Sequence, residues 1–309
     1  EFFRSAIYGM EDLKAQDLPK WELVETEKLL DSSRISVKEW NEIGKIVSDN
    51  YQEFDGFVVL HGTDTMAYTA SAMSFMLSGL GKPVIFTGSQ IPLCETRSDG
   101  RDNLITSLII AGSGKVREVC IYFGGMLLRG NRTTKYSADG MQAFVSPNYP
   151  PLATAGISIQ YNEASMLKGS DRPFRFVPLD EIPIGVLKVF PGIKFPLFAP
   201  VLSGILKGVV LETFGSGNIP DDSGSLNAII GEEGKSDTVI VVCSQCAQGT
   251  VDLEAYEAGS TLRKIGAVSG RDMTSEAAVA KLYYLFSTGS DPEQIRKSIE
   301  MNLAGELTE

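Results

Sequence analysis

Histidine and cysteine are scarce in this sequence, which has one histidine and four cysteines among its 309 residues. A single histidine excludes metal sites that need two histidine ligands, and it leaves a Ser-His-Asp triad only if His61 itself serves. Four cysteines are too few for a disulfide framework in a chain of this length. Cys243 and Cys246 form a C-x-x-C without a second pair, so packing is favoured over a metal site. We therefore expect no bound metal and a reducing compartment, the cytoplasm.

Positive charge is also in short supply. There are 28 lysine and arginine residues against 39 aspartate and glutamate residues, which gives a formal net charge of -11, and no basic patch. Such a charge repels phosphate backbones and anionic lipid headgroups. No apolar run approaches the roughly 18 to 20 residues that cross a bilayer, and the clearest runs, 57–60 and 239–243, have the length of a strand. We therefore expect neither nucleic acid nor membrane as a partner.

Short β-branched runs alternate with helical stretches along the first half of the chain, which is typical of parallel βαβ units. Ser36 and Glu39 form a capping box that predicts the start of a helix. The runs predict a buried strand at 56–60, further strands at 84–87 and 118–123, and helices at 66–77 and 101–111.

The periodicity is lost between Tyr149 and Pro183, where we expect a connector with irregular structure. It then resumes, with strands expected at 185–190, 208–212 and 238–243 and helices expected at 196–206, at 226–231, after Asp272 and after Asp291. The predicted fold class is two α/β domains with mainly parallel sheets. A larger flavodoxin- or Rossmann-like domain is expected over residues 1–165, a linker over 166–184 and a smaller α/β domain over 185–309.

The residues that follow each predicted strand are the first candidates for a site, because parallel sheets bind ligands at the carboxyl ends of their strands. We call these segments strand tips. They are rich in hydroxyls and amides, and they are residues 61–65, 88–90, 129–135, 213–218 and 244–248. A threonine hydroxyl is a weak nucleophile unless a base such as a neutral lysine lies within hydrogen-bond reach. Thr63 and Lys135 are the candidates for this chemistry. Asp64 would orient the lysine or bind a substrate ammonium.

Structural interpretations of the same residues remain open at this point. Thr63 and Asp64 directly before a helix are good N-cap residues. Lys135 alone would be a solvated loop lysine, and His61 would satisfy backbone groups in its turn. Two glycine-bearing tips, at 124–125 and 215–217, lack the spacing of a dinucleotide or P-loop fingerprint, so they are weak signals for nucleotides.

Several segments together resemble the asparaginase family. The stretch His61-Gly-Thr-Asp-Thr-Met-Ala-Tyr-Thr-Ala is similar to the second signature of that family, and Leu30-Asp-Ser-Ser33 resembles its upstream substrate-binding stretch. Further matches to the cytosolic type I branch are Thr87-Gly-Ser-Gln-Ile-Pro, Arg97-Ser-Asp-Gly-Arg-Asp-Asn103, Arg129-Gly-Asn-Arg-Thr-Thr-Lys135, Thr213-Phe-Gly-Ser-Gly-Asn218 and Asp272-Met-Thr-Ser-Glu-Ala277. The resemblance covers essentially the whole chain.

The resemblance implies an L-asparaginase that converts asparagine to aspartate and ammonia through a threonine acyl-enzyme, with weaker action on glutamine. It implies no cofactor, and an assembly as a homodimer or a homotetramer built as a dimer of dimers. The implied catalytic residues are Thr63, Asp64 and Lys135. The implied substrate-binding residues are Asp31, Ser32, Ser89 and Asn218, the last reaching into the site of a neighbouring subunit.

One departure from the family pattern concerns the start of the sequence. The family's Thr-Gly-Gly-Thr-Ile-Gly strand-end motif, with its second catalytic threonine, and the tyrosine of the loop after it should lie before residue 1. We therefore expect the first strand of the larger domain to be missing, and little or no activity for a chain that begins at Glu1.

Two other functions share the predicted fold. One is an amidotransferase subunit that releases ammonia for tRNA-dependent synthesis. The other is a binding or regulatory protein that keeps Thr63 and Asp64 as a ligand cradle without turnover.

Overall fold

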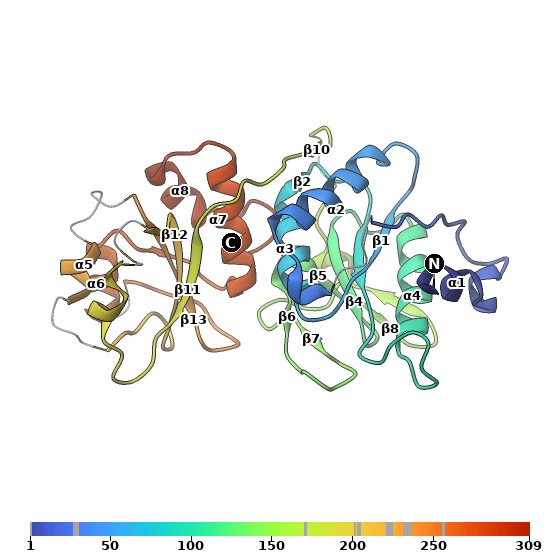
Figure 1. The fold of residues 1–309 in the computed structure, drawn as a ribbon, viewed down its shortest axis with the longest axis horizontal. Coiled ribbons are helices and arrows are strands. Elements are labelled where there is room, and N and C mark those ends of the chain that lie inside the picture. Colours follow the sequence, from blue (N-terminus) through green and yellow to red (C-terminus); the bar gives the residue numbers. More distant parts are fainter. Residues whose placement is uncertain are drawn as a thin grey trace. The chain divides into compact units, whose positions relative to one another are not determined.

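The computed structural model describes residues 2–26, 31–169, 172–200, 202, 205–220, 225–230, 237–254 and 257–309. The chain forms two compact units, Glu1–Phe176 and Val177–Glu309 (Figure 1). Leu30 of the substrate-binding motif and Gly231 of a predicted helix lie outside the described residues.

The first unit is built on a six-stranded sheet with the order β1-β3-β4-β5-β8-β9. Its strands are β1 Phe57–Leu60, β3 Val84–Thr87, β4 Val119–Phe123, β5 Met126–Arg129, β8 Ala153–Ala155 and β9 Ile159–Tyr161. The first three strands pair in parallel, as the alternating pattern predicts, and the last three add on in antiparallel fashion. The sheet is therefore mixed, with the parallel part at the strands that precede the predicted site.

The helices of this unit lie on both faces of the sheet, with α2 and α3 on one side and α4 on the other (Figure 1). The helices are α1 Phe2–Tyr8, α2 Val37–Asp49, α3 Met66–Met76 and α4 Gly100–Gly112, with short 3-10 turns η1 Glu11–Lys14, η2 Ser32–Arg34, η3 Gly130–Arg132 and η4 Glu163–Ser165. The capping box of Ser36 and Glu39 at the start of α2 is confirmed. Two small antiparallel pairs complete the unit: β2 Leu77–Ser78 with β10 Arg175–Phe176, and β6 Thr134–Lys135 with β7 Phe144–Val145.

Strand β1 is half-buried, so the prediction that it is a buried strand is wrong. Every residue of β3 and β4 is buried, whereas every residue of β1 has intermediate exposure. The reason is its position at one end of the strand order, where it pairs only with β3 among the described residues. Val58 and Leu60 still pack against a cluster formed by Ile7, Leu13 and Leu104.

The expectation of a connector with irregular structure after Tyr149 is wrong in part. Strands β8, β9 and β10 fall in that stretch, and β8 and β9 extend the main sheet. They have two or three residues each, which is too short for a period of two to stand out in the sequence. Strand β5 was missed for a related reason, because it follows the turn at Gly124 and Gly125, both with positive φ, as a four-residue run.

The second unit has a four-stranded parallel sheet with the order β11-β12-β13-β14. Its strands are β11 Ile184–Lys188, β12 Gly208–Thr213, β13 Val239–Ser244 and β14 Val268–Ser269, and its helices are η5 Phe195–Phe198, α5 Ser225–Ile230, α6 Glu257–Lys264, α7 Ser275–Ser287 and α8 Pro292–Ile299. The helix expected after Asp291 is confirmed as α8: Asp291 is its N-cap and Pro292 takes the first helical position. Of the helix predicted at 196–206, the described residues show the 3-10 turn η5, α-helical residues 199 and 200 and π-helical residues 202 and 205, and residues 201, 203 and 204 lie outside them. Strand β14 and helix α6 were not predicted.

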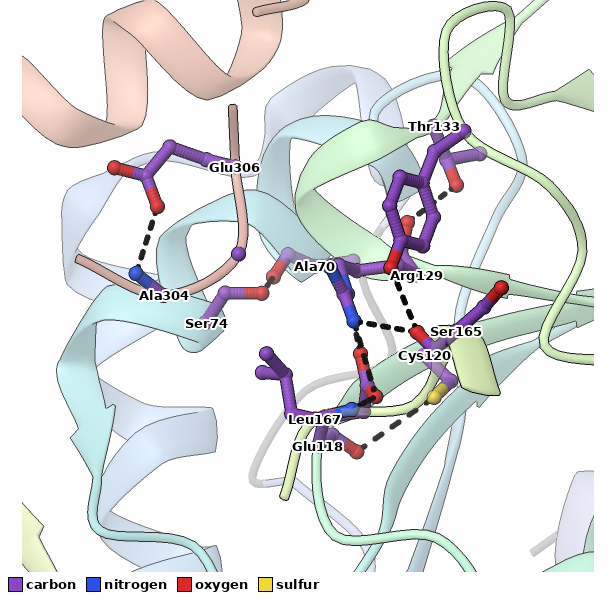
Figure 2. Close-up of polar contacts among 12 residues, drawn as sticks. Ala70, Ser74, Glu118, Cys120, Arg129, Thr133, Ser165, Leu167, Ala304 and Glu306 are labelled. Atoms are coloured by element: carbon purple, nitrogen blue, oxygen red, sulfur yellow. Dashed lines mark hydrogen bonds and ion pairs between the residues drawn. The ribbon is translucent and has the colours of Figure 1, made fainter. Parts of the chain in front are cut away.

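A buried ion pair holds the end of the second unit. Lys281 on α7 and Glu306 are both 0% exposed, and the Lys281 Nζ lies 2.6 Å from the Glu306 Oε1. Glu306 also accepts a hydrogen bond from the backbone N–H of Ala304 at 2.7 Å (Figure 2). The segment after α8 is thus fixed to α7 by charge as well as by packing.

Candidate active site

Lys135 brings together two residues that lie about seventy positions earlier in the chain. Its Nζ donates to the Thr63 Oγ1 at 2.9 Å and to the Asp64 Oδ1 at 2.7 Å. The Lys135 side chain is 20% exposed and that of Asp64 is 62% exposed. The hydroxyl, the carboxylate and the amine that the sequence singles out therefore meet at the carboxyl end of β1.

The turn between β1 and α3 presents Thr63 and Asp64 without using them as helix caps. The N-cap of α3 is Thr65, which makes no side-chain capping hydrogen bond. Its hydroxyl donates instead to the backbone carbonyl of Ser32 at 2.7 Å. The capping interpretation of Thr63 and Asp64 is therefore wrong, and both side chains face Lys135.

His61 fills the base of the same turn. Its Nδ1 lies 2.6 Å from the carbonyl oxygen of Gly62, and its ring packs edge-on against Phe86. Burial lowers the pKa of His61, although the hydrogen bond to Gly62 opposes that shift. A neutral ring whose Nδ1–H donates to a carbonyl supports the backbone, as the structural interpretation of this histidine predicts.

Lys135 follows a buried segment that sets its position. Gly130, Asn131 and Arg132 of η3 are all buried. The guanidinium of Arg132 donates to the carbonyl of Asn148 at 3.0 Å. The interpretation of Lys135 as a solvated loop lysine is wrong, since its backbone continues from this segment into β6 and its amine is bonded.

Below that segment lies a second buried ion pair, between Arg129 and Glu118 (Figure 2). The Arg129 Nε donates to the Glu118 Oε2 at 2.6 Å, and the Arg129 guanidinium lies 4.4 Å from the centre of the Tyr149 ring. The hydroxyl of Thr133 donates to the Arg129 carbonyl at 2.7 Å. These contacts fix both ends of the 129–133 stretch that leads to Lys135.

Ser32 lies directly beside the turn that carries Thr63. A Cβ added to Gly62 would come within 2.6 Å of the Ser32 Oγ, so only glycine allows this approach. Asp31 precedes it and accepts a hydrogen bond from the Ser33 N–H at 3.0 Å, which is the main reason that the pKa of Asp31 is lowered. Both predicted substrate-binding residues are thus at the same end of the sheet as Thr63.

Ser89 also lies near this turn. A Cβ on the preceding residue, Gly88, would come within 2.3 Å of the His61 carbonyl oxygen, so the two turns are in direct contact. Asn218 belongs to the second unit, where its N–H donates to the Phe214 carbonyl at 2.8 Å in a tight turn. Its part in the site stays a prediction.

Gln90 contacts the site, although sequence reasoning gave it no role. Its Oε1 accepts a hydrogen bond from the Thr63 hydroxyl at 3.3 Å. The signal available in the sequence was its place in the strand tip 88–90, next to Ser89.

Two family models match most of the chain. Residues 5–167 match the model described as Asparaginase, N-terminal, and residues 183–299 match the model described as Glutaminase/Asparaginase C-terminal domain. These matches cover the six-stranded sheet of the first unit and the four-stranded sheet of the second.

Individual relatives agree with these matches. L-asparaginase 1 of Escherichia coli (strain K12) is 43% identical over 299 residues, which is 97% of this chain and 88% of that protein. The crystal structure of L-asparaginase I from Vibrio cholerae O1 biovar eltor str. N16961 superposes with a TM-score of 0.91 at 40% identity, covering 99% of this chain and 92% of that one. A glutamyl-tRNA(Gln) amidotransferase subunit of Pyrococcus abyssi (strain GE5 / Orsay) is 34% identical over 288 residues, 90% of this chain and 65% of that protein. The chain belongs to the asparaginase family of amidohydrolases.

Proposed function

We propose that this protein is an L-asparaginase that hydrolyses L-asparagine to L-aspartate and ammonia, with weaker action on L-glutamine. The observation that carries the proposal is the Lys135 Nζ, which contacts the Thr63 Oγ1 at 2.9 Å and the Asp64 Oδ1 at 2.7 Å. A hydroxyl within reach of an amine is the arrangement that activates a threonine as a nucleophile.

The residues around Thr63 suit the amino-acid part of asparagine. Asp64 is largely exposed and faces Lys135 through one carboxylate oxygen, which leaves the other oxygen for a substrate α-ammonium. The hydroxyl and backbone of Ser32 and the anionic Asp31 lie beside the same turn. Ser89, on the touching turn, would meet the side-chain amide. Such anchoring would hold the amide carbonyl near Thr63 in an orientation ready for attack.

The chemistry would then proceed by acyl transfer. Neutral Lys135 accepts the Thr63 hydroxyl proton while the Oγ1 forms a bond to the amide carbon, and the carbonyl oxygen becomes an oxyanion. Collapse of this intermediate breaks the C–N bond, and the Lys135 ammonium returns the proton to the departing nitrogen, which leaves as ammonia. Water then cleaves the ester and restores the Thr63 hydroxyl. Each well-placed oxyanion donor would contribute about 3 kcal/mol to the transition state.

The amidotransferase alternative is less well supported. The chain spans 65% of the amidotransferase subunit and 88% of the Escherichia coli asparaginase, with higher identity to the latter.

We also propose that the protein assembles as a homodimer or as a dimer of dimers. Light scattering would check this as a mass of two or four chains. A cytoplasmic location fits the four cysteines, which are all free. None of the helices in the described residues is long and apolar enough to cross a membrane.

Ammonia release by the full-length protein tests the proposed function. With L-asparagine we expect turnover that Thr63→Ala and Lys135→Met each abolish, and with L-glutamine a lower rate. Lys38→Met is the matched control, because Lys38 is exposed on α2, and it should keep the wild-type rate. Binding of asparagine without ammonia release would refute the proposal and favour a binding protein.

A further inference from the structure

The side-chain amide of Gln90 lies between the Thr63 hydroxyl and the loop that follows Lys135. Its Oε1 accepts from the Thr63 Oγ1 at 3.3 Å, and its Nε2 donates to the Gly140 carbonyl at 3.0 Å. We propose that Gln90 is a positioning residue for the reaction: it holds the Thr63 oxygen beside Lys135 and ties the Lys135 hairpin to the Thr63 turn. This inference rests on the proposed function.

The direction of the Gln90 amide follows from its two partners. A backbone carbonyl such as that of Gly140 only accepts hydrogen bonds, so the NH2 group must face it. The amide oxygen then faces Thr63, and an amide oxygen also only accepts. The Thr63 hydroxyl therefore donates to Gln90, and its lone pairs are left for the Lys135 Nζ at 2.9 Å. Gln90 thus holds the Thr63 oxygen beside the amine, and the hydroxyl proton must turn from Gln90 to Lys135 for the proton transfer proposed above.

Gln90 can orient another group because its own backbone is fixed. The Asp99 carboxylate accepts from the Gln90 N–H at 3.0 and 3.1 Å and from the Ile91 N–H at 3.0 Å. Asn103, one turn further along α4, donates to the Gly88 carbonyl at 3.0 Å. Both ends of the 88–91 turn are thus attached to the start of α4.

The Gly140 contact extends the effect to the lysine. Gly140 lies in the 136–143 loop of the hairpin whose first strand, β6, ends at Lys135. The loop is closed on itself by the Gly140 N–H, which donates to the Ser137 Oγ at 2.8 Å. Gln90 therefore links a rigid loop on the lysine side to the threonine on the other side, and the distance between amine and hydroxyl depends on it.

Two substitutions separate the parts of this role. Gln90→Met keeps a similar length and removes both hydrogen bonds, so the Thr63 oxygen loses one of the contacts that hold it beside Lys135 and the hairpin loses its link. Gln90→Glu keeps an acceptor for Thr63 but sets an oxygen against the Gly140 carbonyl, and it adds a negative charge near Lys135. Asp64 is the charged group already in contact with that amine.

The test measures kcat and KM for the full-length protein with L-asparagine. For Gln90→Met we expect kcat to fall about tenfold, the loss of the one uncharged hydrogen bond that Gln90 makes to the reacting hydroxyl, and KM to change less than threefold. For Gln90→Glu we expect a similar fall in kcat. Gln52→Met and Gln52→Glu are the matched controls, because Gln52 is exposed in the turn after α2, and they should behave as wild type.

Two further measurements distinguish positioning from a general loss of structure. Thermal unfolding should be unchanged in both Gln90 variants, and the Kd for the product L-aspartate should stay within threefold of wild type. The inference is overturned if kcat stays within twofold of wild type, or if aspartate binding is lost together with turnover. In either case wild-type ammonia release that depends on Thr63 would leave the proposed function intact. Absence of wild-type turnover would refute both.

Discussion

Replacing Lys281 by methionine tests how the second unit holds its last residues. Methionine has a similar length but no charge. In the structure the Lys281 Nζ lies 2.6 Å from Glu306 and donates to the Ile299 carbonyl at 2.8 Å. Burial lowers the pKa of Lys281, and the neighbouring Glu306 carboxylate opposes that shift. The substitution would leave the buried carboxylate without its counter-charge.

The expected loss of stability follows from the complete burial of the Lys281 and Glu306 side chains, which are both 0% exposed. Removing one partner of a buried ion pair typically destabilises a protein by about 3–5 kcal/mol, because the other charge stays buried. Glu306 keeps hydrogen bonds from the N–H groups of Leu303 and Ala304. We therefore expect the free energy of unfolding to fall by about 3 kcal/mol, the lower end of this range. For a unit of this size that corresponds to a fall in Tm of roughly 10 °C.

Urea unfolding of the full-length protein followed by circular dichroism would measure this change. Lys297→Met is the matched control, because Lys297 forms an exposed ion pair with Glu293 on α8 in the same unit, and its unfolding midpoint should be unchanged. The double variant Lys281→Met with Glu306→Gln should recover part of the loss, since an amide needs no counter-charge. If Lys281→Met unfolds at the same urea concentration as Lys297→Met, the reasoning is refuted.

Two more predictions concern the site and the cysteines. Asp64→Asn keeps the size of the side chain and removes its charge, so we expect KM for L-asparagine to rise about tenfold through loss of a charged contact to the ammonium; steady-state kinetics would check this, and an unchanged KM would contradict the role of Asp64. A thiol-reactive chromophore should label the exposed Cys94 and Cys246 at once, whereas Cys120 and Cys243 should react only after unfolding, because burial raises the pKa of both and brings that of Cys243 to about 12. A third fast thiol in the folded protein would contradict that prediction.

The meeting of Thr63, Asp64 and Lys135 could be predicted because the carboxyl ends of parallel strands lie at one edge of a sheet, and these residues follow the strands expected at 56–60 and 118–123. In the structure the antiparallel β5 and the turn η3 intervene before Lys135, which is the last residue of β6. The local rule alone gave a different answer, since Thr63 and Asp64 precede a helix and resemble caps. Tertiary structure decides against it, because Thr65 is the N-cap of α3 and its hydroxyl bonds to the Ser32 carbonyl.

Other features depend on partners that the sequence does not link. Gln90 meets Thr63 across 27 positions and Gly140 across 50, so no local pattern marks it. Strands β8 and β9 are too short to show a period, and they are strands because β8 pairs with β5 and β9 pairs with β8. The half-buried state of β1 likewise follows from its place in the sheet and not from its apolar residues.

The contacts around Glu118 and Arg129 limit where the first unit can be truncated for separate expression. The Ser165 carbonyl accepts from the Arg129 guanidinium at 2.9 Å, and the Leu167 N–H donates to Glu118 at 2.7 Å (Figure 2). A fragment that stops at residue 165 would strip one of those donors from a buried carboxylate and would also remove β10 from its pairing with β2. A separately expressed first unit should therefore extend to Phe176 at least. In a shorter fragment the contacts of Glu118 and Arg129, which support the segment before Lys135, would be weakened away from the substrate.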